Sequence, residues 1–280
     1  MYIRTREGLG QGQVTWSNPQ TPRNELGEPV KCEEIPKKYD LENRKGLTRS
    51  KVECPTRKDA AQILSGIVKR AVQMLDNTIG ELKRAREAAC RGEPLGWPNL
   101  GDVTACWLKY RLGVCIDDIS AWTKGPFESR TVAEVIRRLV RPRNLLASNG
   151  ITYVCEATCK SPSTYAWVKA TEAGVCLRTP PRIIHLCPRF WNLEHAPYRE
   201  LTIIHEAVHL THCAATEDEG RRVSIGSPEC LAQFVAATNG KKLDPEFIGR
   251  CGLTNKCGPV PKECRLKPKD VGKALPDWRP

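Results

Sequence analysis

The sequence predicts an α+β fold that is mainly helical, with a small sheet beside a helix that carries the candidate site. Three observations lead to this expectation. Apolar residues recur at helical spacing through much of residues 56–141, short runs rich in β-branched and aromatic residues follow between 151 and 187, and two more helices are indicated between 197 and 240. Hydrophobic residues make up 40% of the 280 positions, which supports a packed core.

The long helix that opens this region has the strongest pattern. Its apolar positions are Ala60, Ile63, Leu64, Ile67, Val68, Ala71, Val72, Leu75, Ile79 and Leu82. Thr56 to Asp59 resembles a capping box, so we expect a helix from there to about Cys90. Residues 102–123 and 131–141 also predict helices. Pro142 is expected to end the second, because proline removes a backbone donor.

The pattern then changes to short strands. The three candidates are Ile151–Cys155, Thr164–Lys169 and Arg182–Cys187. A helix is expected to start near Pro197, since proline suits the first helical position. Ser227 is a typical cap for another helix, which Asn239-Gly240 should end.

The chain divides into three parts on these signals. Residues 1–55 are rich in Pro, Gly and charge and predict an extended arm or linker. Residues 56–240 form the main domain, and residues 241–280 form a basic, Cys- and Pro-rich extension held by disulfides.

The most informative motif is H-E-x-x-H at His205, Glu206 and His209. Two histidines four positions apart lie on one face of a helix, and neutral imidazole is a preferred ligand of zinc. The glutamate between them is placed to act as general base toward a zinc-activated water. The motif therefore predicts a Zn²⁺ site in a metallopeptidase. His212 follows on the same side of the helix and is expected at the surface.

A catalytic zinc site needs a third protein ligand. Two downstream carboxylates are candidates, Asp218 and Glu229, and we favour Asp218. Glu229 is the alternative because helix-borne glutamates serve glutamate-type zincins, and otherwise it is expected within the cleft. Tyr165 to Val168, which includes Trp167, is the candidate strand for pairing with an extended peptide substrate.

From about Tyr153 to Val235 the chain resembles the aspzincins, the deuterolysin and peptidyl-lysine metalloendopeptidase family. The matching segments are Ile184–Phe190, His205–His209, Thr216–Asp218 and Ser227–Phe234. The resemblance implies a zincin-like fold with Asp218 as the third ligand. The family's transition-state tyrosine falls on Arg221, a cation that would stabilise an oxyanion instead. Of the family's lysine-recognising acids, only Glu229 is retained, while Ala232 fills the other place.

Cysteine and charge content bear on the destination and partners of the chain. Fourteen spread cysteines predict disulfides and a secreted or otherwise oxidising destination such as the periplasm. Met1 to Gln20 lacks the apolar segment of a secretory signal, which suits delivery by a dedicated machine or as part of a larger exported protein. The net charge is +12, with one cluster at Arg130, Arg137, Arg138, Arg141 and Arg143 that is expected to be solvated surface.

The expected function is zinc-dependent peptide hydrolysis by an exported or toxin-type effector, acting on a peptide or protein substrate. An immunity or carrier protein is a candidate partner. No nucleic-acid motif accompanies the basic clusters, and no apolar run is long enough to span a membrane. Two alternatives remain open: a non-catalytic, zinc-stabilised binding module, and an amidase acting on cell-envelope peptides.

Overall fold

The computed structural model describes residues 32–33, 51–55, 57–93, 95, 99–148, 150–168, 182–212, 225–243, 251–261 and 264–265. Its helices are α1 (Ala60–Cys90), α2 (Asp102–Tyr110), α3 (Ser120–Thr123), α4 (Val132–Ala147), α5 (Arg199–Thr211) and α6 (Pro228–Thr238). Its strands are β1 (Lys51–Glu53), β2 (Thr152–Cys155), β3 (Ala166–Trp167) and β4 (Ile183–Leu186), and two 3₁₀ helices precede α5, η3 (Pro188–Trp191) and η4 (Leu193–Tyr198). This mixed, mainly helical architecture agrees with the predicted α+β class.

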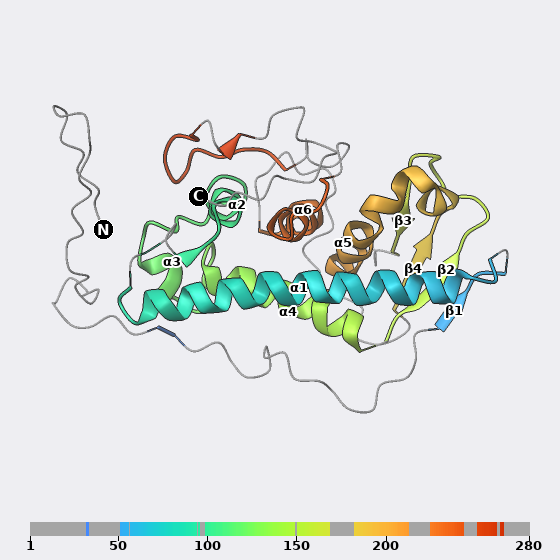
Figure 1. Ribbon diagram of the computed structural model, residues 1–280, viewed down its shortest axis with the longest axis horizontal. Coiled ribbons are helices and arrows are strands. Elements are labelled where there is room, and N and C mark those ends of the chain that lie inside the picture. The colour runs from blue at the N-terminus through green and yellow to red at the C-terminus, as the bar shows by residue number, and fades with distance from the viewer. Residues whose placement is uncertain are drawn as a thin grey trace.

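The long helix α1 organises the fold. Its 31 residues span about 46 Å at 1.5 Å per residue, and it runs along the longest axis of the molecule (Figure 1). α4, α5 and α6 all pack against it, and α5 also packs against both α4 and α6. The predicted bounds were accurate, but Asp59 rather than Thr56 occupies the cap position. The Asp59 side chain pairs with Arg57 and caps no backbone group, so the capping-box interpretation was wrong.

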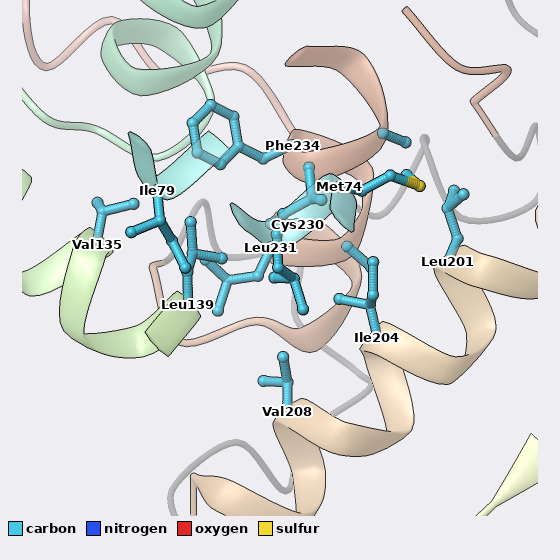
Figure 2. Close-up of a cluster of buried hydrophobic side chains, with 14 of the residues drawn as sticks. Met74, Ile79, Val135, Leu139, Leu201, Ile204, Val208, Cys230, Leu231 and Phe234 are labelled. Atoms are coloured by element: carbon cyan, nitrogen blue, oxygen red, sulfur yellow. The ribbon is translucent and has the colours of Figure 1, made fainter. Parts of the chain in front are cut away.

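The core is the space enclosed by four helices. Figure 2 shows Met74 and Ile79 of α1 meeting Leu139 of α4, Ile204 of α5 and Leu231 of α6. Most of the apolar side chains in this cluster are fully buried. Because α5 contributes apolar residues to this cluster, the site helix is held by the main core of the protein.

A four-stranded sheet lies at one end of α1 in the order β1-β2-β4-β3 (Figure 1). β1, β2 and β4 are parallel, with Tyr153 opposite Ile184 in the register of β2 and β4. β3 is antiparallel to β4 and forms an edge of the sheet. The predicted strand at 164–169 is shorter than expected, and Lys169 lies outside the described residues.

Two helix predictions were wrong in their extent. Residues 102–123 form two helices, because Gly113 adopts a φ of +69° beyond α2 and the amide of Val114 turns back to the carbonyl of Leu108. Pro142 does not end α4, which continues to Ala147. A proline within a helix leaves the carbonyl four residues earlier without its helical donor. That carbonyl, on Arg138, has another donor, His212.

Disulfides connect distant parts of the chain. The described residues contain twelve cysteines, all paired: Cys32–Cys90, Cys54–Cys155, Cys106–Cys264, Cys115–Cys257, Cys159–Cys187 and Cys230–Cys251. We call Cys106–Cys264 and Cys115–Cys257 the C-terminal disulfides, since they join residues 257–264 to α2 and the loop after it. The predicted disulfide-rich character is confirmed and indicates an oxidising or extracellular environment. Within the part of the chain that the structure describes, no helix is long and apolar enough to cross a membrane.

Candidate metal centre

The two motif histidines converge on one face of α5. His205 and His209 are each partly buried, and their Nε2 atoms lie 3.1 Å apart with the rings edge to face. Two nitrogens bound at about 2.0–2.1 Å to one tetrahedral ion would be about 3.3 Å apart. The observed separation is close to that value. The pair therefore fits two ligands of a single zinc ion.

Glu206 is directed into the protein rather than to solvent. It follows His205 immediately, and only 4% of its surface is exposed. A carboxylate at this position is largely shielded from bulk water. Its burial suits the general-base role that the motif predicts.

The opposite face of α5 explains why the helix holds its position. Leu201, Ile204 and Val208 point toward α6 and α1 (Figure 2), and all three are buried. At the first turn, Glu200 forms an ion pair with Arg70 of α1 at 2.5 Å. Apolar packing on one side therefore presents the two histidines on the other.

The start of α5 is fixed by a buried histidine. His195 in η4 is 3% exposed, stacks on Tyr165 with 3.7 Å between ring centroids, and contacts Thr202 Oγ1 through Nε2 at 2.9 Å. Burial lowers the pKa of His195 to about 3, with a smaller contribution from the charges of Arg199 and Arg189. His195 is therefore neutral at physiological pH.

The end of α5 is fixed by a second buried histidine. His212 is 5% exposed, and its Nε2 lies 2.8 Å from the backbone carbonyl of Arg138. Because a carbonyl only accepts, Nε2 carries the proton and donates. Burial lowers the pKa of His212 to about 3 despite this bond, and the charges of Arg138, Arg141 and Arg137 act in the same direction. The expectation of a surface histidine was wrong.

The carbonyl that His212 contacts is the one left without a helical donor by Pro142. In α4 the amide of residue 142 would bond to the carbonyl of residue 138, but proline has no N–H. His212 supplies a donor there from the end of the site helix. From the sequence, Pro142 was expected to end a helix and His212 to be exposed, and the contact between His212 and the carbonyl freed by Pro142 was not predicted. A proline inside a strongly periodic helix was the available signal.

Glu229 lies at the first turn of α6 and is 2% exposed. The Ser227 hydroxyl donates to Glu229 Oε2 at 3.1 Å and accepts from the amide of Cys230, which confirms the predicted cap. Among the described residues, no three His, Cys, Asp or Glu side chains are grouped to hold a metal ion. Asp218 and Arg221 lie outside the described residues.

The edge strand β3 carries an aromatic cluster. Trp167 is 37% exposed and stacks on His185 of β4, with 3.7 Å between ring centroids and 5° between planes. His185 Nδ1 lies 2.5 Å from Glu156 Oε1, so the ring is held from both sides. β3 also contacts α5. Trp167 was a candidate from sequence, whereas the supporting pair of His185 and Glu156 was not recognised.

Part of the basic cluster is neutralised within the fold. Glu134 of α4 accepts hydrogen bonds from Arg137 at 2.8 Å and from Arg138 at 2.5 Å. Arg143 forms a two-point ion pair with Asp76 of α1 at 2.8 and 3.1 Å. The interpretation of this cluster as solvated surface was therefore wrong for these three arginines, which are mostly buried in ion pairs.

Comparison with known proteins gives one result that bears on the site. Residues 123–225 match the family model of the aspzincins. That family is described as lysine-specific metallo-endopeptidase. The matched region contains α4, strands β2 to β4, α5 and the segment that carries Asp218 and Arg221, and it ends before Glu229. No curated protein sequence matches the chain.

Proposed function

Since the chain is a zinc metallopeptidase of the aspzincin type, we propose that it hydrolyses peptide bonds at the centre formed by His205, Glu206 and His209. The observation that carries this proposal is the 3.1 Å approach of the two Nε2 atoms on the solvent-accessible side of α5. Zinc, the cofactor of this family, supplies polarisation of the scissile carbonyl and a lowered pKa for a water molecule.

In the proposed mechanism, the side chains of the motif divide the work. His205 and His209 would hold the ion through Nε2. Glu206 accepts the proton of the attacking water and delivers it to the nitrogen of the leaving amine. The burial of Glu206 supports this role, because its carboxylate exchanges the proton without competition from bulk solvent. We assign stabilisation of the developing oxyanion to Arg221, whose charge is permanent.

We propose Asp218 as the third ligand. Two observations favour it over Glu229. The family match includes Asp218 and stops before Glu229. Within the described chain, Glu229 does not join the two histidines in a three-ligand group and instead accepts a hydrogen bond from Ser227. We assign Glu229 to the wall of the cleft, where its charge would favour a basic substrate side chain.

The edge strand β3 is the proposed binding surface for the substrate backbone. Its outer edge has no neighbouring strand among the described residues, and an extended peptide can pair with such an edge. Trp167 offers an exposed ring that His185 holds in place. Contact between β3 and α5 would bring a peptide on this edge toward the two histidines.

The disulfides support action outside a reducing compartment, and we propose that the protein is an exported effector. A protein of this kind would need a carrier, or an immunity protein in the producing cell. In the alternative, the substrate is a cell-envelope peptide. Hydrolysis of its amide bond would follow the same chemistry, so only a cleavage assay with both kinds of substrate distinguishes the two. The alternative of a non-catalytic zinc module predicts bound zinc with no turnover.

The test combines metal analysis with a cleavage assay on mixed peptides, including peptides with and without lysine and a peptidoglycan stem peptide. Glu206→Gln should retain zinc and lower turnover by about two to four orders of magnitude. Asp218→Ala should lose zinc, while Glu229→Gln should retain it. Glu194→Gln is the matched control, since it makes the same change at an exposed position of η4 away from the motif.

Full activity of the Glu206→Gln protein would refute the proposal. If Glu229→Gln lost zinc and Asp218→Ala retained it, Glu229 rather than Asp218 would be the third ligand. Zinc-loaded wild-type protein that cleaves none of the substrates would support the binding-module alternative.

A further inference from the structure

A second concave site lies between the end of α2 and residues 251–265. Its cavity has a volume of about 620 Å³, within the usual range for ligand pockets. It is lined by Arg111, Leu253, Thr254, Asn255, Val260 and Arg265. α6 separates α2 from α5 (Figure 1), so this cavity is distinct from the candidate metal centre.

Arg111 is a buried cation at the wall of this cavity. It is 7% exposed, its Nη1 donates to the carbonyl of Cys251, and its guanidinium lies 5.0 Å from the ring centroid of Trp107. In the described part of the chain no carboxylate pairs with Arg111. The nearby Asp117 pairs instead with Lys109.

An unpaired buried charge is unfavourable, because the protein replaces only part of its lost hydration. Burial accordingly lowers the pKa of Arg111 to about 10, and no acidic group among the described residues offsets this effect. An arginine has five N–H donors, of which the Cys251 carbonyl uses one. An anion in the cavity would satisfy further donors and offset the cost of burial.

The other lining residues indicate what kind of anion fits. Arg265 is exposed at the rim and makes a weak contact to the carbonyl of Val260 at 3.4 Å, so its charge is available to a ligand. Leu253 is 42% exposed and, together with Val260, gives the cavity an apolar wall. Two guanidinium groups beside an apolar wall suit a carboxylate that carries an apolar substituent.

The site is also held in shape before any ligand arrives. The amide of Thr254 donates to the carbonyl of Tyr110 at 2.8 Å, so one wall is bonded to the end of α2. The C-terminal disulfides and Cys230–Cys251 anchor the same segment at three further points. A preformed pocket loses little conformational entropy on binding.

We propose that this cavity binds the carboxylate of a small ligand with an apolar side group, such as the C-terminal residue of a peptide or a short fatty acid, through Arg111 and Arg265. Binding here does not depend on hydrolysis at the zinc centre.

The test uses the full chain and titration calorimetry with three probes. N-acetyl-leucine represents a peptide C-terminus, hexanoate represents a fatty acid, and N-acetyl-leucine amide has the same shape as the first without the charge. We expect at least one acid to bind and the amide to bind about tenfold more weakly or not at all, since a hydrogen bond to a charged group is lost. Which acid binds better identifies the source of the carboxylate.

Arg265→Gln tests the site without disturbing the core, because Arg265 is exposed. It should weaken the acid several-fold. Arg111→Lys keeps the charge but loses the fork of donors, and should weaken it about tenfold. Arg84→Gln on the exposed face of α1 is the matched control and should leave binding unchanged. Glu206→Gln should also bind normally, which separates this site from the catalytic proposal.

Equal binding of acid and amide, or no binding of either acid, would overturn the inference. Equal weakening of acid binding by Arg84→Gln and Arg265→Gln would also overturn it. Such a result would show that the acid is attracted by the net charge of +12 rather than by this cavity.

Discussion

Replacing His212 by phenylalanine tests whether Pro142 and His212 act as a pair. Pro142 leaves the Arg138 carbonyl without its helical donor, and His212 donates to that carbonyl from the end of the site helix. Phenylalanine keeps an aromatic ring, somewhat larger than imidazole, and removes the donor. Pro142→Ala restores an N–H four residues after Arg138, which can form the ordinary helical bond.

The structure sets the expected magnitudes. His212 is 5% exposed, so His212→Phe leaves a largely dehydrated carbonyl without this donor and should cost about 1–3 kcal/mol of unfolding free energy. Pro142→Ala alone should change stability little, because the gained hydrogen bond opposes the greater freedom of the unfolded chain, a term of about 0.4–1 kcal/mol. In the double variant the new N–H serves the carbonyl. The loss caused by His212→Phe should then shrink by about 1 kcal/mol.

The assay is urea unfolding of the four proteins, followed by tryptophan fluorescence, with zinc affinity measured in parallel. His209 lies three residues before His212, so zinc binding should weaken in His212→Phe and partly recover in the double variant. Thr131→Ala, which removes the cap at the other end of α4, is the control partner for Pro142→Ala. That control pair should be additive. A coupling between His212→Phe and Pro142→Ala below about 0.3 kcal/mol would refute the reasoning.

Two further predictions concern stability. His195 and His212 have a folded-state pKa of about 3, below the ordinary 6.5. The unfolded chain therefore binds more protons between these values, and stability that is complete above pH 6.5 is lost as the pH falls toward 3. Each histidine should cost up to about 2 kcal/mol between pH 7 and 5 in urea unfolding of zinc-free protein, and His195→Gln should remove about half of the slope, with an unchanged slope contradicting the assignment. For the C-terminal disulfides, serine replacement of either pair should cost about 3 kcal/mol, because the other bridge keeps the opened loop near 16 residues. Removing both should cost about 8 kcal/mol, since a loop on the order of 100 residues, allowing for Cys159–Cys187 and Cys230–Cys251 inside it, then opens as well. Simple additivity of the two single losses would count against this estimate.

Local patterns in the sequence were sufficient for much of the secondary structure. Ala60 to Leu82 predicted α1 because a 3.6-residue period lies within one helix and needs no knowledge of its neighbours. Ser227 with Pro228 predicted the start of α6 for the same reason, since a cap bonds to an amide three residues away. The split between α2 and α3 was missed because the apolar residues that follow Gly113, Val114 and Ile116, join the main core from a loop and so continue the apolar pattern.

The sequence by itself determined that the two histidines of the candidate site lie together, because His205 and His209 occupy a spacing that one helical turn converts into a shared face. Only the tertiary structure showed what holds that helix. His195 and Tyr165 fix its beginning, and His212 and the Arg138 carbonyl fix its end, through contacts between residues up to 74 positions apart. The same holds for Trp167 and His185, which become neighbours through strand pairing. It holds too for Arg111, which is buried without a carboxylate partner among the described residues where disulfides bring residues 251–265 onto α2. Contacts of this range depend on how the elements pack, and the period of a single segment carries no information about them.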